Sequence, residues 1–248
     1  MSAPELIRFQ SPAEMARAAA MAWLADIETM RPTGKPYGVA LPGGRFARRF
    51  FDCTVELARA QGISLAGVHF FWADERCVPP TDEESNFKVA QEGLFGPLQI
   101  PPGNIHRLRG ELNPAAAVEL AIRELNQVMP AGPAGQPVLD LILLGMGEDG
   151  HVASLFPNAG PAVTECTAPF LALDDSPKPP ARRISLSYPT ICAAREAWAL
   201  ISGDSKADAL QESLKKDGKT PFSRVIRQKS GRGVRVFCDS TKDFSYFL

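Results

Sequence analysis

The most apolar run of the chain, Val138–Leu144, lies between Gly135 and Gly145 and is the feature that most constrains the fold. A short apolar run flanked by glycines is typical of a strand that is buried on both faces. Val68–Trp72 is a second run of this kind. Strands buried on both faces occur in parallel sheets that helices cover on each side, so these runs favour an α/β fold.

Helix-start patterns alternate with these strands along the chain. Ser11-Pro12-Ala13-Glu14 is a capping box with proline at the first helical position, and it predicts a helix that runs to Ile27. Asn113-Pro114 predicts a helix to about Val128 by the same cap and proline. The other expected elements are helices from Arg45 to about Gln61 and from Gly203 to Lys216, and strands at Tyr37–Leu41, Arg183–Ser187, Ala197–Ser202 and Val234–Cys238.

This alternation predicts right-handed strand–helix–strand crossovers, and hence a three-layer α/β/α fold with a mostly parallel, Rossmann-like sheet. The proline-rich segment Asp174–Pro180 is the best candidate for a linker, but it is too short to mark a domain boundary. We therefore expect residues 1–248 to form one domain, since α/β folds of this length are common.

The charge of the chain is balanced, with 27 basic and 28 acidic side chains and a formal net charge of −1. Such a chain has no bulk attraction for nucleic acid or an anionic membrane, so we expect a small-molecule partner at a local site. The five cysteines have no C-x-x-C spacing, which indicates neither a zinc site nor a disulfide framework. Together with the lack of a signal-peptide pattern and of a long apolar run, this favours a cytoplasmic protein without a metal or other cofactor.

Ligands of parallel sheets bind beyond the carboxyl ends of the strands, so the loops that follow the expected strands are where a site is expected. Gly43, Gly44 and Arg45 follow the first of these strands. Paired glycines let backbone N–H groups approach an anion, and a cation at a helix start needs an anionic partner. Lys206, in the first turn of a later helix, has the same need. Taken alone, a plain β-turn explains the glycines, and an exposed lysine offset by Asp204 explains Lys206.

The strand Val68–Trp72 is followed by the charged residues Asp74, Glu75 and Arg76. Arg76 is the best shaped of them for phosphate, because a guanidinium group binds two oxygens at once, and we expect Asp74 to contact the same ligand. A charged triplet at a strand end is also common on a solvated surface. Ser85 or Asn86 is explained as the cap of the next helix.

The loop after the central strand is rich in glycine and contains Gly147, Asp149 and His151. Its backbone can face a ligand, so we expect Gly147 to contact the substrate. Asp149 can orient the imidazole of His151 or hold its charged form. Histidine has an ordinary pKa of about 6.5 and suits proton transfer near neutral pH. Of the other two histidines, His69 fits a core strand and His106 lies in a loop.

Together these segments resemble a known family. Leu141–Pro157, which contains Gly145-Met-Gly-Glu-Asp-Gly-His151, resembles the signature loop of 6-phosphogluconolactonases. Phe71–Pro79, followed by Ser85-Asn86, resembles the second signature of that family, and Arg183–Pro189 with Gly203 and Lys206 resembles its later elements. The resemblance covers roughly residues 5 to 240. It implies the fold of glucosamine-6-phosphate deaminases and a metal-free hydrolysis of 6-phosphoglucono-δ-lactone to 6-phosphogluconate in the oxidative pentose phosphate pathway.

The resemblance also implies roles for single residues. His151, with Asp149 beside it, would activate the water that attacks the lactone carbonyl and then return a proton to the ring oxygen. Backbone N–H groups of the glycine loop would stabilise the oxyanion. Arg45, Arg76 and Lys206 would hold the phosphate, and Arg183, in one of the matching elements, is expected to contact the substrate.

The first glycine loop departs from the family pattern, which reads Ser-Gly-Gly-Ser/Arg-Thr-Pro. Here the loop reads Pro42-Gly-Gly-Arg-Phe-Ala47, so two hydroxyl groups that could contact phosphate are missing. Arg45 remains, and Arg48 or Arg49 are candidates to compensate.

Two other functions compete with the lactonase. Glucosamine-6-phosphate deaminases carry a carboxylate five residues after the histidine, where this chain has Phe156, and usually a tyrosine in place of Arg76. Both differences favour the lactonase. A non-catalytic sugar-phosphate sensor would explain the altered glycine loop, but not the retention of Asp149 and His151.

Overall fold

The central sheet contains six strands, and each neighbouring pair is parallel. The computed structural model describes residues 4–133, 135–229 and 232–244. Across the sheet the strand order is β1-β9-β8-β5-β2-β3. These strands are β1 Glu5–Arg8, β2 Tyr37–Leu41, β3 Val68–Trp72, β5 Leu141–Leu144, β8 Glu196–Ile201 and β9 Val234–Cys238.

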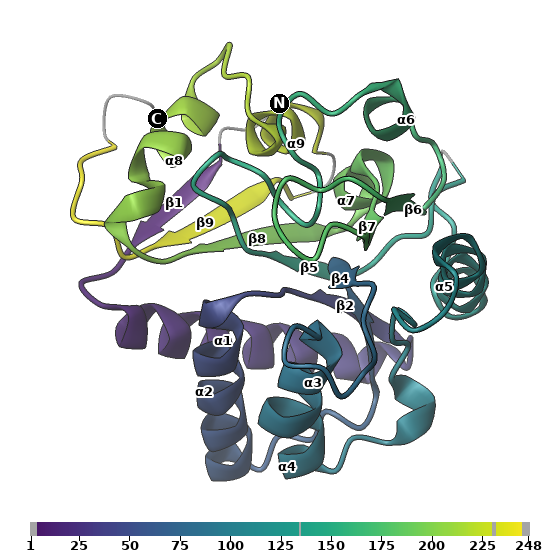
Figure 1. The fold of residues 1–248 in the computed structure, drawn as a ribbon. Helices are drawn as coiled ribbons and strands as arrows, with labels where there is room; N and C mark the ends of the chain where they lie inside the picture. The colour runs from purple at the N-terminus through teal and green to yellow at the C-terminus, as the bar shows by residue number, and fades with distance from the viewer. Residues whose placement is uncertain (1–3, 134, 230–231, 245–248) are drawn as a thin grey trace.

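Helices cover both faces of this sheet. In Figure 1, α1, α2, α3 and α4 lie below the sheet, whereas α7, α8 and α9 lie above it. Every residue of the central strands β2, β5 and β8 is buried between these two layers. The three-layer α/β/α fold with a mostly parallel sheet is therefore confirmed. The helices are α1 Pro12–Met30, α2 Arg45–Gln61, α3 Asn86–Ala90, α4 Gly96–Leu98, α5 Pro114–Val128, α6 Pro161–Thr164, α7 Tyr188–Ala193, α8 Ala207–Leu214 and α9 Pro221–Gln228.

The predicted helix starts have the expected caps. The side chain of Ser11 accepts a hydrogen bond from the Glu14 N–H at 3.2 Å, and that of Asn113 accepts one from the Ala115 N–H at 3.0 Å. These bonds satisfy N–H groups that have no partner within the helix. The sequence therefore sets where α1 and α5 begin, although α1 continues to Met30, beyond the predicted end.

The central strand is shorter than its apolar run indicates. β5 begins only at Leu141, although the N–H of Asp140 already donates to the carbonyl oxygen of Gly38 in β2 at 2.9 Å. The N–H of Val138 donates to the carbonyl oxygen of Pro130 at 2.9 Å. The side chain of Asp140 accepts the N–H of Gly38 at 2.9 Å. The run thus indicates burial correctly and overestimates the length of the strand.

A second, antiparallel sheet of three strands, in the order β4-β7-β6, does not follow from the sequence patterns. It consists of β4 Asp74–Arg76, β7 Arg183–Leu186 and β6 Phe170–Leu173. The expected strand at Arg183–Ser187 is present as β7, but it belongs to this sheet and not to the parallel one. The segment Asp174–Pro180, the best candidate for a linker, lies between the antiparallel strands β6 and β7 and is part of the loop of a hairpin.

The helix predicted from Gly203 to Lys216 is divided. A 3₁₀ turn at Asp204–Lys206 leads into α8, which ends at Leu214. Gly203 has a φ of +94°, a left-handed conformation that glycine adopts without strain. The chain therefore turns sharply after β8, and Lys206 lies at the junction between the turn and α8.

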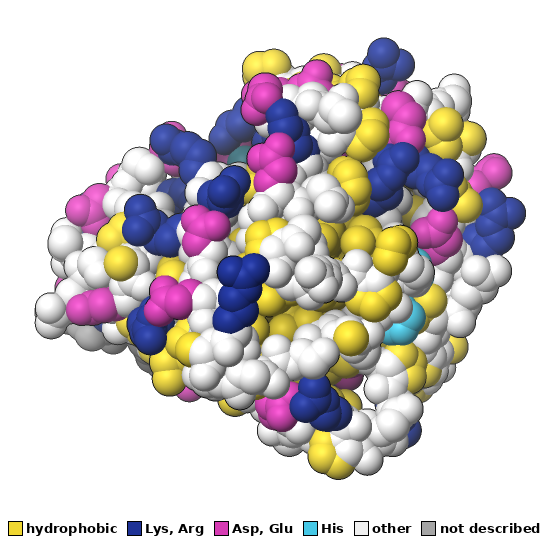
Figure 2. Space-filling view, turned by 90° about the horizontal axis from the view of Figure 1, so that it is seen from below, with side chains coloured by type: hydrophobic (Ala, Val, Ile, Leu, Met, Phe, Trp, Pro, Cys, Tyr) yellow, Lys and Arg dark blue, Asp and Glu magenta, His cyan; other side chains and the backbone are white. Residues whose placement is uncertain are grey.

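The face of the molecule below the sheet carries a mixture of charges. Figure 2 shows Lys and Arg side chains interspersed with Asp and Glu over this face, as the balanced composition predicts. In the described ranges, no helix is long and apolar enough to cross a membrane.

Candidate active site

The carboxyl ends of β2 and β5 meet where the order of the strands reverses. The chain passes from β2 outward to β3, and later enters β5 on the opposite side of β2. Ligands of open parallel sheets bind at such a switch point. Gly43 and Gly145 are close together there, because a Cβ on Gly145 would lie 3.7 Å from the carbonyl oxygen of Gly43.

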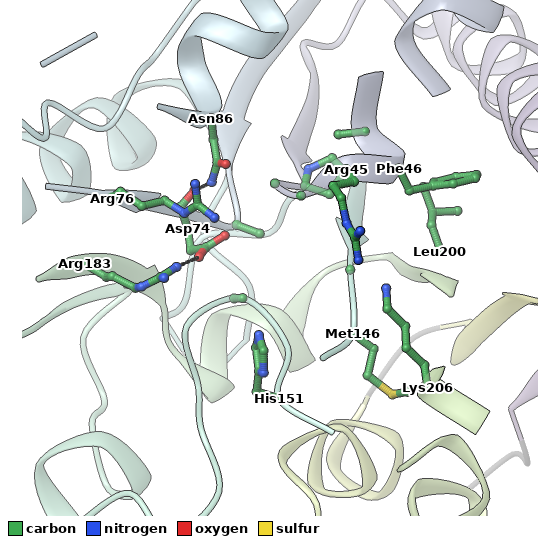
Figure 3. Close-up of a pocket in the computed structure, with 17 residues that line it drawn as sticks. Arg45, Phe46, Asp74, Arg76, Asn86, Met146, His151, Arg183, Leu200 and Lys206 are labelled. Carbon is green, nitrogen blue, oxygen red and sulfur yellow. Dashed lines mark hydrogen bonds and ion pairs between the residues drawn. The ribbon is translucent and has the colours of Figure 1, made fainter. Parts of the chain in front are cut away.

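A cavity opens at this edge of the sheet (Figure 3). All ten residues predicted for the site lie in the described part of the chain, and eight of them line the cavity. The other two, Asp149 and Gly147, contact His151 from behind. The lining residues are Pro42, Gly43, Gly44, Arg45, Phe46, Ala47, Ala73, Asp74, Arg76, Asn86, Gly145, Met146, His151, Ala153, Arg183, Leu200 and Lys206.

His151 and Asp149 form a hydrogen-bonded pair. Oδ1 of Asp149 lies 2.5 Å from Nδ1 of His151 and also accepts the backbone N–H of His151 at 3.2 Å. The carboxylate therefore places the ring proton on Nδ1 and leaves the lone pair on Nε2. Burial lowers the pKa of His151, and the hydrogen bond and charge of Asp149 only partly oppose this. Burial raises the pKa of Asp149, but the bonds from His151 outweigh it and leave that pKa below its ordinary value. At neutral pH the pair is a neutral imidazole beside a carboxylate.

Gly147 leaves the space in which this pair lies. A Cβ on Gly147 would lie 2.1 Å from Nδ1 of His151 and 2.6 Å from Oδ1 of Asp149. The N–H of Gly147 donates to the carbonyl oxygen of His151 at 2.9 Å, and the N–H of Gly150 donates to that of Gly147 at 3.0 Å. The loop is folded on itself, and these two N–H groups are bonded within it.

Phe156 packs against the imidazole of His151, with ring centroids 4.5 Å apart. It occupies the position at which the deaminase pattern has a carboxylate. An apolar ring at this place excludes water from one side of His151 and so contributes to the burial that lowers its pKa.

Arg45 and Lys206 approach each other at one end of the cavity (Figure 3). Arg45 is the first residue of α2, preceded by Gly44 with a φ of +86°. Burial lowers the pKa of Lys206, and the positive charge of Arg45 lowers it further. Within the described residues, no carboxylate forms an ion pair with either side chain. Two facing cations at helix starts are stabilised by an anion between them, so this end of the cavity is suited to a phosphate.

Asp74, Arg183 and Ser154 form a second polar group on the other side of His151. Oδ2 of Asp74 accepts the hydroxyl of Ser154 at 2.6 Å and lies 3.8 Å from Nη1 of Arg183. The sequence analysis did not identify Ser154, which is fully buried three residues after His151. It ties the loop of the acid–base pair to β4.

Arg76 lies with Asp74 and Arg183, away from the Arg45–Lys206 pair (Figure 3). Nη1 of Arg76 donates to the carbonyl oxygen of Glu84 at 2.5 Å and lies 3.1 Å from its carboxylate. Arg76 therefore already has an anionic partner, whereas none of the described carboxylates forms an ion pair with Arg45.

The proposed substitutes for the missing hydroxyl groups do not reach the cavity. Arg48 is exposed on α2 and pairs with Asp52 at 3.1 Å and with Glu92 at 3.9 Å. Neither Arg48 nor Arg49 is among the lining residues. The expected compensation is thus not seen, since Arg48 is paired with carboxylates outside the cavity and Arg49 is exposed and does not line it.

Glu75 is buried, which the charged triplet around it did not indicate, and only 2% of its surface is exposed. One carboxylate oxygen accepts the N–H groups of Arg76 and Asn86, each at 2.8 Å. The other accepts the N–H of Phe87 at 2.8 Å and the hydroxyl of Ser85 at 3.1 Å. Burial raises the pKa of Glu75 to about 7, although these backbone bonds act to lower it. Ser85 is the cap of α3, as predicted.

Lys178 is a further charge near the site that the sequence analysis did not identify. Arg183 holds the backbone of its loop by donating to the carbonyl oxygens of Lys178, Pro179 and Pro180 at 3.1–3.2 Å. Burial and the interactions between Asp149 and His151 are the larger influences on the pKa values of these two residues. The positive charge of Lys178 is a smaller influence that lowers both pKa values. Because linkers have the same proline-rich composition as this loop, the sequence did not indicate that Lys178 lies near the site.

The two remaining histidines form a pair outside the cavity. Nδ1 of His69 lies 3.0 Å from Nε2 of His106, and both side chains are only partly buried. The apolar strand around His69 predicted that this residue lies in the core. That prediction is wrong, because His69 is only partly buried and β3 is the outermost strand of its sheet. In the described ranges, no group of three or more His, Cys, Asp and Glu side chains is arranged to hold a metal ion.

A parallel sheet with a histidine–aspartate pair and two facing cations at its switch point is the arrangement expected of an α/β enzyme with a small anionic substrate. Residues 10–235 match the family of glucosamine-6-phosphate isomerases/6-phosphogluconolactonases. The 6-phosphogluconolactonase of Mycobacterium tuberculosis is 43% identical over 182 residues, which cover 71% of this chain and 71% of that protein. The chain belongs to the glucosamine-6-phosphate isomerase/6-phosphogluconolactonase family.

Solved structures agree with this assignment. The 6-phosphogluconolactonase of Trypanosoma brucei is 27% identical, with a TM-score of 0.81 over 95% of each chain. A monomeric glucosamine-6-phosphate deaminase has a TM-score of 0.78 at 18% identity and covers 98% of this chain and 100% of its own. The deaminase shares the fold, and at this identity the similarity carries no information about activity.

Proposed function

We propose that this chain is a cytoplasmic 6-phosphogluconolactonase, which hydrolyses 6-phosphoglucono-δ-lactone in the oxidative pentose phosphate pathway. One observation carries the proposal. A neutral imidazole held by a carboxylate lies in the same cavity as two facing cations that no carboxylate of the described residues pairs with. The residues that build this cavity run from Pro42 to Lys206, which supports a single catalytic domain.

The two ends of the cavity suit the two ends of the substrate. The phosphate binds between Arg45 and Lys206, beside the backbone of Gly43 and Gly44. The lactone ring then extends toward His151, with its carbonyl group near Asp74, Arg76 and Arg183.

Hydrolysis uses His151 twice. Nε2 takes a proton from water as the water oxygen bonds to the lactone carbonyl carbon, and the carbonyl becomes an oxyanion. Asp149 stabilises the imidazolium that forms, through its bond to Nδ1. The oxyanion then collapses, the bond to the ring oxygen breaks, and Nε2 gives its proton to that oxygen. The product is an open-chain acid, which ionises to the carboxylate.

The oxyanion needs positive partners beyond the glycine loop. The N–H groups of Gly147 and Gly150, which lie in the loop expected to serve as donor, are bonded within that loop. We assign the oxyanion to the guanidinium groups of Arg76 and Arg183, because both line the cavity on the carbonyl side of His151.

Two assays test the proposal. Purified protein should form 6-phosphogluconate from the lactone faster than the spontaneous opening of the ring, measured in parallel without enzyme. It should release no ammonia from glucosamine 6-phosphate, because Phe156 cannot take the place of the deaminase carboxylate. A lactone rate equal to the spontaneous one, with the sugar phosphate still bound, would identify a sensor instead.

A further inference from the structure

The side chain of Asn86 lies directly against the backbone of the glycine loop. The loop lacks the hydroxyl groups of the family pattern. Apart from the side chain of Arg45, only its backbone N–H groups can therefore bind a phosphate, and the position of the backbone decides whether they reach it. A Cβ on Gly43 would lie 2.5 Å from both Nδ2 and Oδ1 of Asn86. The amide of Asn86 therefore lies flat against Gly43 and limits where this backbone can go.

Asn86 is itself fixed at two points by β4. Its Nδ2 donates to the carbonyl oxygen of Asp74 at 2.9 Å, and its backbone N–H donates to Oε1 of Glu75 at 2.8 Å. Only 4% of its surface is exposed. A shift of the Glu75 carboxylate would therefore shift Asn86, and with it the support of Gly43.

The Glu75 carboxylate depends on its hydrogen bonds. It is buried, and within the described residues no cation forms an ion pair with it. A buried carboxylate is costly unless its oxygens are satisfied, and here each oxygen accepts two bonds from the segments next to it in β4 and α3. These four hydrogen bonds fix the position of the Glu75 side chain between β4 and α3, which makes it a support for Asn86.

We propose that Glu75 is a positioning residue for substrate binding. Through Asn86 it holds the backbone of Gly43 and Gly44 where that backbone meets the phosphate of the substrate. The inference rests on the proposed function, because it assigns the phosphate to this loop. It explains how a loop without its usual hydroxyl groups keeps a defined anion site.

The test is Glu75→Gln, which keeps the size of the side chain but replaces one acceptor oxygen with an amide donor. We expect the KM for the phosphorylated lactone and the inhibition constant for inorganic phosphate to rise together, by about tenfold or more, while kcat changes by less than about threefold.

Glu196→Gln is the matched control. Glu196 is also a buried carboxylate, which accepts the Trp198 indole N–H at 2.8 Å, but it is the first residue of β8, at the amino end of that strand, and does not line the cavity. It should leave both constants unchanged.

A second variant keeps the test decisive if Glu75→Gln does not fold by circular dichroism. Asn86→Ala removes the amide from Gly43 and leaves Glu75 in place, and it should raise the same two constants. Where both variants fold, the KM of the double variant should be no higher than that of the single variant with the higher KM. The effects should not add, because Glu75 acts on the loop only through Asn86. Unchanged KM and phosphate inhibition in these variants, or a fall in kcat alone, would overturn the inference. If the wild type lacks lactonase activity, the proposed function fails by itself, and calorimetric titration with inorganic phosphate still measures the effect of Glu75.

Discussion

The two ends of the cavity are built in different ways. The acid–base end is local, because Gly147, Asp149 and His151 contact one another within one loop after β5. The phosphate end is assembled from Arg45 at the start of α2 and Lys206 before α8, which are far apart in the sequence. A local site needs only the conformation of its loop, whereas an assembled site needs the whole sheet and the contacts that hold each loop.

The comparison makes a prediction about substitutions. Changes at the local end should abolish the chemistry and leave phosphate binding intact. Changes at the assembled end should weaken binding and leave the chemistry largely intact. Three sets of substitutions test this difference, and the pH dependence and chelation then test the chemistry itself, in order from the largest expected effect to the smallest.

His151→Ala should show the largest effect. We expect kcat to fall by about 10²–10⁴-fold, because this is the typical contribution of a positioned acid–base residue. Inhibition by inorganic phosphate should stay at the wild-type level, since phosphate binds at the other end. A variant that is folded by circular dichroism and hydrolyses the lactone at the wild-type rate would show that the mechanism is wrong.

Gly147→Ala should affect the chemistry through position alone. The added methyl would lie 2.1 Å from the imidazole of His151, so the ring must move by about an ångström or more to restore an ordinary contact. A displacement of this kind can cost about 100-fold in kcat. Gly103→Ala is the control, because a Cβ at Gly103 meets no atom within 4 Å. Equal activity of the two variants would contradict the packing described here.

Arg45→Ala and Lys206→Ala should raise the KM for the phosphorylated lactone. Loss of one charge-assisted contact costs about 1.5–3 kcal/mol, or roughly ten- to a hundredfold in binding. Hydrolysis of unphosphorylated gluconolactone should change little, because it has no phosphate to lose. The exposed Lys216 provides the control variant, Lys216→Ala.

Arg76 is the residue that the sequence favours most for phosphate, but it lies on the carbonyl side of the cavity. Arg76→Ala should therefore reduce hydrolysis of the two lactones more equally than Arg45→Ala or Lys206→Ala does. Equal losses on both lactones for Arg45→Ala would remove the phosphate assignment.

The pH dependence should follow His151. Burial lowers its pKa below the ordinary 6.5, so the neutral base is present above that lowered pKa and is lost as the pH falls through it. We expect kcat/KM to be constant near pH 7 and to fall about tenfold per pH unit on the acid side. Measurement with unphosphorylated gluconolactone, after subtraction of spontaneous opening, removes the titration of the phosphate. A profile without an acid limb would exclude a histidine base.

Exhaustive chelation should have no effect on activity. The sequence has no cysteine–histidine cluster with the spacing of metal ligands, and the proposed steps use only side chains and water. The measurement is lactonase activity before and after chelation. Activity that is lost and then restored by zinc or magnesium would show that the prediction is wrong.

The sequence predicts the local end of the site better than the assembled end. Glycines, an aspartate and a histidine after an apolar run indicate a loop with acid–base chemistry, because all of its contacts lie within a few residues. Arg45 and Lys206 were identified through the cost of a cation at a helix start and through the resemblance to the family, not through any contact between them. That they face each other depends on the strand order, which no local pattern contains.

Other residues were misjudged for a similar reason. Glu75 belongs to a charged triplet that suggests a surface, but the small antiparallel sheet buries it against α3. Lys178 lies in a proline-rich stretch that suggests a linker, but Arg183 holds this stretch beside the cavity. In each case the decisive contact crosses between elements that the sequence does not place together.

The amino-acid sequence alone determined the layered α/β architecture, the starts of α1 and α5 and the loop that carries His151. Hydrophobic runs, caps and glycines act over a few residues, so their effects can be predicted locally. The tertiary structure alone decided which cations meet, that Arg76 lies apart from them, and that Glu75 supports Asn86. These features depend on the register and order of distant strands, whose pairing is set by the packing of the whole sheet.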